Sequence, residues 1–163
     1  MSEAITVPPE EEVVQEEPPI PTRRLLAFDV GGTVFACDMD FFREIVPAQH
    51  TTRLPGAPDT VCGLINLRGT IVTVVDGGVT LGKRPAAKGT GLILLIDYFD
   101  RLAGVAVDDV RDIHDVPIDQ ITDAKDSDSL AAGIVTGAVE IEGREVIVLD
   151  VRALVQEVIG QGR

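Results

Sequence analysis

The sequence NLRG at residues 66–69 interrupts a run of Ile, Val and Leu that extends over residues 63–76. An amide and a guanidinium are unusual inside such a run, because buried polar groups need partners. The planar guanidinium of Arg68 is suited to bidentate recognition of a carboxylate, and Gly69 readily adopts turn conformations. Arg68 could therefore act in binding, in catalysis or only in a turn between strands. We expect a turn first and a docking feature second.

Other side chains that could support chemistry are few and scattered. His50 lies in a Thr-rich connection and His114 beside an apolar strand position, so ordinary histidines are favoured over metal ligands or bases. The acidic stretch at 123–129 lacks the glycine and the distal glutamate of a calcium loop, and we interpret Asp108 and Asp109 as surface carboxylates. Complete dinucleotide, phosphate-loop, hydrolase and zinc motifs are absent. We therefore expect no enzymatic activity, no metal and no cofactor.

The charge of the chain disfavours nucleic acid and anionic membranes as partners. Its 163 residues include 27 acidic and 14 basic side chains, a formal charge of −13, whereas phosphate binding needs clustered Lys and Arg. Residues 1–22 hold six of the acidic residues and no basic residue, and their Pro and Glu content predicts a disordered tail. Two cysteines form no disulfide framework, and neither a signal peptide nor an apolar run of ~20 residues is recognised. We expect a cytoplasmic protein.

From Arg24 onward, short apolar runs typical of strands dominate the chain. Apolar residues at helical spacing occur in 151–159 and predict a helix there. Asp150, just before it, is the predicted N-cap, and Gly160, just after it, is expected to end the helix. Single strands are expected at 41–48 and 111–117. The remaining runs pair into four predicted hairpins, with turns at Gly31-Gly32, at Arg68-Gly69, near Asp100-Arg101 and at Glu142-Gly143.

The chain also repeats itself weakly. The pattern GxxVxVxD at 69–76 recurs at 143–150, and Arg-acid-Ile at 43–45 recurs at 111–113, which predicts two equivalent β lobes. Continuous apolar runs such as 91–96 need cover on both faces, which two packed barrels would provide. We therefore predict a mainly β protein with two five-stranded β-barrel subdomains around a shared hydrophobic core and a short C-terminal helix.

Taken together, TRLPGAPDTVCGLINLRGTIVTVVD at 52–76 is similar to the signature of the CheW-like family of bacterial chemotaxis coupling domains. The similarity continues through 101–113 and 140–155. The resemblance implies a CheW-like domain over residues 23–163, with two intertwined barrel lobes. It also implies a non-enzymatic adaptor that couples the cytoplasmic tips of chemoreceptors to the regulatory domain of a CheA-type histidine kinase. Such an adaptor meets the membrane only through the receptors.

The resemblance suggests roles in receptor and kinase coupling for Glu44, Gly63, Asn66, Arg68 and Gly104. Glu44 matches an acidic position expected near the arginine. Arg68 could therefore form an internal ion pair with Glu44, contact a partner, or do both. An exposed pair of this kind contributes only ~0–1 kcal/mol to stability.

The chain departs from the family pattern in three ways, and two other functions stay open. Thr73 stands where proline is common, and the acidic tail is not a family feature. Gly77-Gly78 stands where Leu-Arg is common, which predicts a more flexible segment after Asp76. The same fold could serve pilus motility or developmental signalling. A small-molecule-binding or enzymatic β domain would instead show a deep polar pocket with converging titratable groups, whereas flat apolar patches near Asn66 and Gly104 would favour the adaptor.

Overall fold

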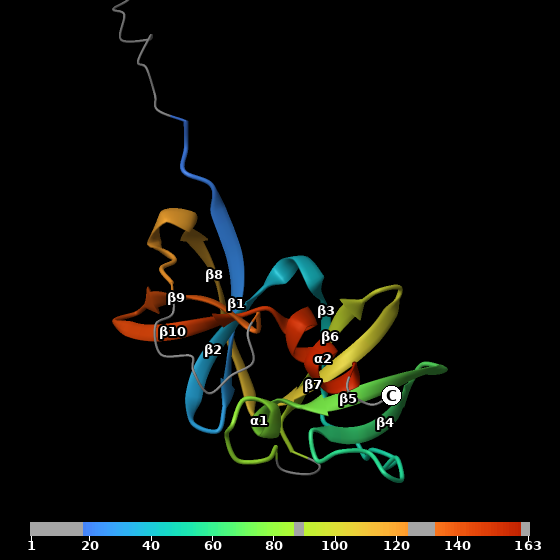
Figure 1. The fold of residues 1–163 in the computed structure, drawn as a ribbon. Helices are drawn as coiled ribbons and strands as arrows, with labels where there is room; N and C mark the ends of the chain where they lie inside the picture. Colours follow the sequence, from blue (N-terminus) through green and yellow to red (C-terminus); the bar gives the residue numbers. More distant parts are fainter. Residues whose placement is uncertain (1–17, 87–89, 124–132, 161–163) are drawn as a thin grey trace, which may run out of the picture.

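The computed structural model describes residues 18–86, 90–123 and 133–160, which form two β-sheets and a few short helices, with α2 between the sheets (Figure 1). The first half contains β1 (Thr22–Val30), β2 (Thr33–Asp38), η2 (Met39–Phe41), β3 (Phe42–Pro47), β4 (Val61–Leu67), β5 (Thr70–Asp76) and α1 (Gly77–Thr80). The second half contains β6 (Leu92–Tyr98), β7 (Arg101–Val107), β8 (Asp109–Pro117), η3 (Ile118–Gln120), β9 (Val135–Ile141), β10 (Arg144–Leu149) and α2 (Val151–Ile159).

The two sheets exchange strands between the halves of the chain. Sheet A has the order β8-β1-β2-β10-β9, and sheet B has the order β3-β6-β7-β5-β4. Each sheet contains one parallel pair, β2 with β10 in sheet A and β5 with β7 in sheet B. The two halves of the chain are equivalent, β1 to β6, β2 to β7, and so on to β5 and β10. When each strand label of sheet A is replaced by its equivalent, the order becomes that of sheet B. The predicted repeat is therefore present, but each lobe is built from strands of both halves.

Strand pairing closes neither sheet into a barrel within the described residues. The outer strands are β8 and β9 in sheet A and β3 and β4 in sheet B, and neither outer pair is joined. An isolated backbone bridge adds a further partner in each lobe, Thr52 to Leu64 on β4 and Thr122 to Ala138 on β9. The prediction of two five-stranded lobes is confirmed, while open sheets replace the expected closed barrels.

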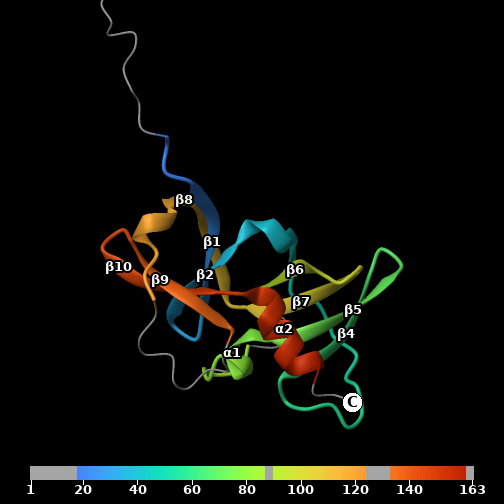
Figure 2. The same cartoon turned by 45° about the horizontal axis from the view of Figure 1, so that its top comes forward.

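Three apolar clusters fill the molecule, and the alternation of side chains along each strand decides which cluster a residue joins. On β1, Leu25 points into a cluster within the lobe of sheet A, whereas Leu26 points into a central cluster. On β6, Ile93 points into a cluster within the lobe of sheet B, whereas Leu94 joins the central one. The central cluster also includes residues of α2, which lies over β6 and β7 between the sheets (Figure 2). This shared core explains why the strands are apolar on both faces.

The C-terminal helix and most turns form where the sequence predicts them. The Asp150 side chain accepts a hydrogen bond from the backbone N–H of Ala153, and Gly160 ends α2. Backbone φ is positive at both residues of the turns Gly31-Gly32, Arg68-Gly69 and Glu142-Gly143. The remaining hairpin turn lies one residue earlier than predicted, at Phe99 and Asp100, where φ is 45° and 67°.

The segment after Asp76, predicted to be flexible, is an ordered helical turn. Asp76 accepts a hydrogen bond from the backbone N–H of Val79 and so caps α1. Both glycines of α1 are buried, and a Cβ atom on Gly78 would lie 2.0 Å from the carbonyl oxygen of Arg84. Glycine is required at this position because the chain crosses it too closely for any side chain.

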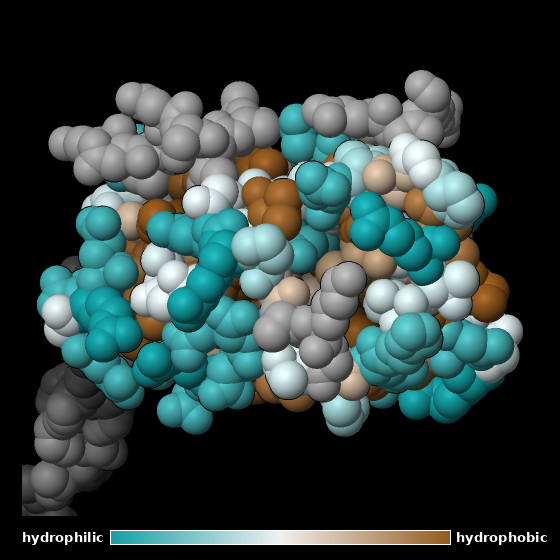
Figure 3. Space-filling view, turned by 90° about the horizontal axis from the view of Figure 1, so that it is seen from below, coloured by the Kyte–Doolittle hydropathy of each residue, from teal (hydrophilic) through white to brown (hydrophobic). Residues whose placement is uncertain are grey.

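The surface carries hydrophobic residues in small, separate areas among hydrophilic ones when it is seen from below (Figure 3). Within residues 18–86, 90–123 and 133–160, no helix has the length and apolar character needed to span a bilayer. The predicted tail at 1–22 is described only from Pro18, and its last residue, Thr22, already belongs to β1 and pairs with Pro117 of β8, so the strand begins earlier than predicted. The acidic stretch at 123–129 is described only at Asp123. Those two predictions therefore lie mostly outside the described residues.

Candidate functional site

The turn between β4 and β5 is held in one conformation by its own side chains. Arg68 and Gly69 have φ values of 51° and 88°, the geometry of a tight two-residue hairpin turn. The side-chain oxygen of Asn66 accepts a hydrogen bond from the backbone N–H of Gly69 at 2.9 Å. Asn66 therefore fixes the turn, and its exposed side chain lies at the tip of a hairpin that projects away from sheet A (Figure 1).

Arg68 forms an internal ion pair with Glu44, one of the two roles that the resemblance left open for it. The pair joins the hairpin tip to β3, on the opposite edge of sheet B. The side chains remain 68% and 40% exposed for Arg68 and Glu44 respectively. Glu44 is two residues from the buried Val46, so it lies on the inward side of β3, beyond the apolar cluster of this lobe. The ion pair thus closes the end of that cluster while leaving the guanidinium accessible.

Ile71 adds a large apolar side chain beside the turn, and the sequence reading missed it. It lies directly opposite Asn66 in the β4–β5 ladder and is 61% exposed. Its neighbours Val72 and Val74 are fully buried, so Ile71 has the outward position of a strand with alternating burial. The alternation of Ile71 and Thr73 with Val72 and Val74 along the strand is the sequence signal that could have placed Ile71 on the outward side. We call Glu44, Asn66, Arg68 and Ile71 the hairpin face.

Gly63 is a structural residue of β4 rather than a surface group. It is buried, has a φ of 141°, and a Cβ atom on it would lie 2.4 Å from the carbonyl oxygen of Thr52. The absence of a side chain lets Thr52 and Leu64 exchange two backbone hydrogen bonds of 2.8 Å. Gly137 has the same role on β9, where an added Cβ would lie 2.8 Å from the carbonyl oxygen of Thr122. Gly63 therefore positions the chain that leads to the hairpin face.

Gly104 lies in the middle of β7 and is also buried. A Cβ atom on Gly104 would lie 2.8 Å from Cγ2 of Ile93 and 3.3 Å from Cγ2 of Val74. Both neighbours belong to the apolar cluster of sheet B. The structure thus brings Glu44, Asn66 and Arg68 together at the surface and places Gly63 and Gly104 inside the same lobe. Any effect of Gly104 on a partner would be transmitted through packing.

The equivalent end of sheet A is open instead of closed by an ion pair. The repeat matches Glu44 with Asp112 and Arg68 with Glu142, and two carboxylates cannot form that pair. A cavity of about 220 Å³ lies there. Its lining consists of Ala27, Val34, Arg111, Asp112, His114, Ile141, Glu142, Arg144 and Val146. The volume is below the ~300–1,000 Å³ of typical small-molecule sites, so the small-molecule alternative gains little from it.

Two further ion pairs occupy equivalent positions in the two lobes. The Nε atom of Arg43 lies 3.1 Å from Asp97 between β3 and β6, and the Nε atom of Arg111 lies 2.9 Å from Asp29 between β8 and β1. The hydrogen bond to Asp29 raises the pKa of the Arg111 guanidinium. All four side chains are partly exposed to solvent, so these pairs serve mainly to fix the outer strands in register.

Comparison with known proteins identifies similar domains over most of the chain. A family model described as the CheW-like domain matches residues 24–158. The chemotaxis protein CheW of Rhizobium meliloti (strain 1021) is 32% identical over 130 residues, which cover 78% of this chain and 84% of that protein. Protein PilI of Pseudomonas aeruginosa is 29% identical over 100 residues, which cover 60% of this chain and 56% of that protein.

A solved structure shares the fold. The crystal structure of the scaffolding protein TtCheW from Thermoanaerobacter tengcongensis superposes with a TM-score of 0.73. The superposition covers 82% of this chain and 92% of the other, at 23% sequence identity. The arrangement of two five-stranded sheets and a C-terminal helix is therefore a known architecture.

Proposed function

Because this chain belongs to the family of CheW-like domains, we propose that it is a chemotaxis coupling adaptor without enzymatic activity of its own. It links the cytoplasmic tips of chemoreceptors to the regulatory domain of a CheA-type histidine kinase. It works in the cytoplasm and reaches the membrane only through the receptors. The adaptor domain is residues 23–163, and residues 1–22 are an acidic tail that precedes it.

The observation that carries this proposal is the hairpin face. Arg68 is oriented by Glu44, yet its side chain remains 68% exposed. Ile71, at an outward position of β5 close to the same turn, is 61% exposed. In protein interfaces apolar side chains supply much of the affinity, while charged groups set register and specificity. A rigid turn that presents both kinds of group is suited to a protein partner, and we assign the kinase regulatory domain to this face.

The proposal is tested by NMR titration of the isotope-labelled chain with the regulatory domain of the CheA-type kinase from the same organism. We expect saturable shifts centred on the hairpin face, and loss of binding in Arg68→Glu. Arg24→Glu is the matched control, because Arg24 is also an exposed, ion-paired arginine, with a side chain 64% exposed, but lies on β1 of the other lobe. No shifts up to about millimolar partner, a binding free energy weaker than ~−4 kcal/mol, would refute the kinase assignment.

The same fold in pilus motility is the second candidate function. The similarity to PilI favours it, although that match covers less of this chain than the match to the chemotaxis protein. The two candidates differ only in the partner. Titration with the regulatory domains of both a chemotaxis-type and a pilus-type kinase from the same organism separates them, since the tighter complex identifies the pathway.

A further inference from the structure

The two lobes differ in the side chains that fill equivalent inward positions. At the offset of 68 residues that relates β3 to β8, Ala27 of sheet A matches Leu95 of sheet B, and Val34 matches Leu102. The residues that pair with Ala27 and with Leu95 across their hairpins are separated by the same offset. Both leucines pack in the apolar cluster of sheet B. Sheet A therefore has two smaller side chains in these places, which leaves space inside its lobe.

The same end of sheet A also differs in polarity. His114 occupies the position that the buried Val46 has in sheet B. Asp112 and Glu142 occupy the positions of the ion pair that closes sheet B. Because side chains at these two positions contact each other in sheet B, the fold directs two carboxylates toward the same place in sheet A. Like charges repel at such a separation, which favours a ligand that brings a positive charge between them.

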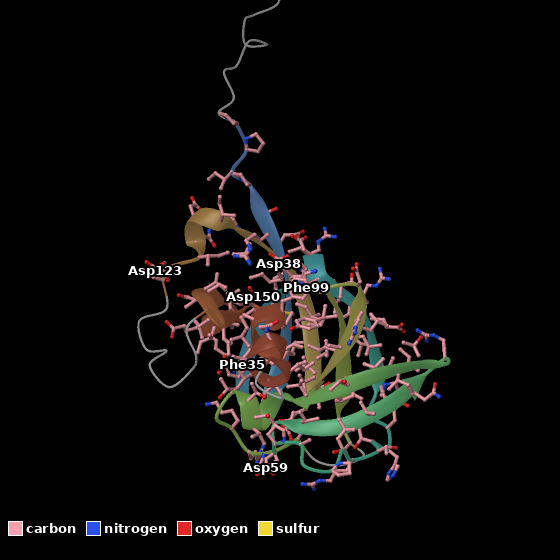
Figure 4. The ribbon with its side chains drawn as sticks, turned by 45° about the vertical axis from the view of Figure 1, so that its right-hand side comes forward. Phe35, Asp38, Asp59, Phe99, Asp123 and Asp150 are labelled. Carbon is pink, nitrogen blue, oxygen red and sulfur yellow. The ribbon has the colours of Figure 1, made fainter. Side chains whose placement is uncertain are left out.

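These exchanges produce the cavity of about 220 Å³ at the open end of sheet A. Its floor is apolar and consists of Ala27, Val34, Ile141 and Val146. Phe35, the residue after Val34 on β2, points to the other face of the sheet and lies in the central cluster with residues of α2 (Figure 4). The cavity is therefore separate from the core that the two lobes share.

The polar side chains around the cavity are available to a ligand. Asp112 and His114 lie on the same side of β8 as the buried Val116. Arg144 lies on the inward side of β10 in the same way. Within residues 18–86, 90–123 and 133–160, no hydrogen bond or ion pair joins these three polar side chains, or that of Glu142, to another residue.

The charges around the cavity select the kind of ligand. Nε of Arg111, which also lines the cavity, already donates to Asp29. The groups that a ligand can meet are therefore the carboxylates of Asp112 and Glu142 and the guanidinium of Arg144. Because both signs of charge are present, a zwitterion satisfies the site better than a simple cation or a simple anion. The apolar floor adds a place for an apolar side chain.

The volume fits a small ligand of this kind. The cavity is smaller than the sites of drug-sized molecules. A water molecule takes ~30 Å³ of liquid volume, so about 220 Å³ has room for about seven atoms of that size. This is close to the number of non-hydrogen atoms in valine.

We propose that the open end of sheet A is a binding site for a small apolar α-amino acid. The ammonium group of the ligand lies between Asp112 and Glu142, and its carboxylate is held by Arg144, whose planar guanidinium suits that group. The apolar side chain of the ligand packs on Ala27 and Val34. The site lies in the lobe opposite the hairpin face, so it goes beyond the proposed adaptor function and does not depend on it.

The proposal is tested by NMR titration of the isotope-labelled chain with L-valine. We expect saturable shifts at the residues that line the cavity, with a Kd of about 1 mM. Isobutylamine and isovalerate retain the apolar part of valine but carry only the amine or only the carboxylate. Each should bind about tenfold more weakly than valine, because one charged end of the site is left without a partner.

Two variants test the assigned contacts. Arg144→Gln should weaken valine binding about tenfold through loss of the charged partner of the carboxylate. Ala27→Leu places the leucine of sheet B in the cavity and should abolish binding, while circular dichroism reports whether the fold is retained. Arg101→Gln is the matched control, because Arg101 is also an exposed arginine at the start of a strand but lies on β7 of the other lobe. Its affinity for valine should equal that of the parent chain.

Each other result would overturn the proposal. The absence of saturable shifts up to about 20 mM valine, or shifts centred outside the cavity, would show that this is not an amino-acid site. An affinity for isobutylamine equal to that for valine would mean that the site takes a simple cation. Unchanged valine binding in Arg144→Gln would remove the assigned carboxylate contact. The adaptor function stands in all of these cases, since its own test uses the kinase domain and the hairpin face.

Discussion

Asp76, at the end of β5, and Asp150, directly after the equivalent strand β10, each cap the helix that follows. The Asp76 carboxylate accepts from the backbone N–H of Val79, and the Asp150 carboxylate accepts from that of Ala153, both at 3.1 Å. Asp76 alone has a second task, because both of its oxygens also accept from the backbone N–H of Ala86, at 3.1 and 3.2 Å. Asp76 is 6% exposed, so it anchors the segment after α1 from inside the protein.

This difference predicts unequal costs for the same substitution. Asp150→Ala removes a helix cap and should lower the free energy of unfolding by about 1 kcal/mol. Asp76→Ala also leaves the N–H of Ala86 without its partner, which should raise the loss to about 2–3 kcal/mol. Urea denaturation of both variants measures the difference. Equal losses would mean that the bonds from Ala86 contribute nothing.

Reversal of the charge at Arg68 should separate stability from binding. Arg68→Glu breaks an exposed ion pair, so the free energy of unfolding should change by less than about 1 kcal/mol, while binding of the kinase domain is lost. The double variant Arg68→Glu/Glu44→Arg should restore the internal pair but not the complex. Full recovery of binding in the double variant would show that only the internal pair matters. If Arg68→Glu alone unfolds the domain, the role of Arg68 as a partner contact loses its support.

Two glycines of the same hairpin should respond differently to alanine. In Gly63→Ala the new methyl group lies 2.4 Å from the carbonyl oxygen of Thr52, so the bridge to Leu64 must open. In Gly69→Ala the methyl group meets open space, and only the strain of a φ of 88° remains. We expect a loss of about 1–2 kcal/mol for Gly69→Ala and a clearly larger loss for Gly63→Ala. Thermal unfolding ranks the two, and the opposite order would contradict the close approach at Thr52.

Gly104→Val should act on partners only through the fold. The added side chain would push against Ile93 and Val74, and overpacking of this kind costs about 1–3 kcal/mol. Affinity for the kinase domain, corrected for the folded fraction measured by circular dichroism, should then equal that of the parent chain. A lower corrected affinity would indicate that the change spreads from β7 to the hairpin face.

The Cys37 thiol should be inert in the native protein. Burial raises its pKa to about 12, so almost no thiolate exists near pH 8. In Cys62→Ser, a thiol reagent at pH 8 should label Cys37 only at the rate of unfolding. Because the folded pKa lies above the unfolded one, the contribution to stability is complete below the ordinary thiol pKa and is lost as the pH rises toward about 12. Rapid labelling of the native variant would contradict the burial of Cys37.

Short-range features of this protein could be predicted from its sequence. Turn residues placed three of the four hairpins correctly, and the cap at Asp150 with the stop at Gly160 defined α2. The hairpin tip at Phe99 was missed by one residue, because an aromatic residue at positive φ breaks the usual preference for glycine or asparagine. The ordered turn at Gly77-Gly78 was missed as well, because two glycines suggest flexibility, whereas the cap from Asp76 orders the turn and the close carbonyl of Arg84 requires glycine at position 78.

The sequence by itself determined the strands, most turns, the repeat and the pattern of residues buried on both faces, since these follow from backbone preferences and from alternation along each strand. Only the tertiary structure decided that β10 pairs with β2 and that β5 pairs with β7, which mixes the two halves of the chain in each lobe. Only that exchange places Glu44 beside Arg68 and Arg152 between Phe41 and Phe99. Side-chain periodicity defines the faces of a strand, but it does not encode which distant strand will cover them.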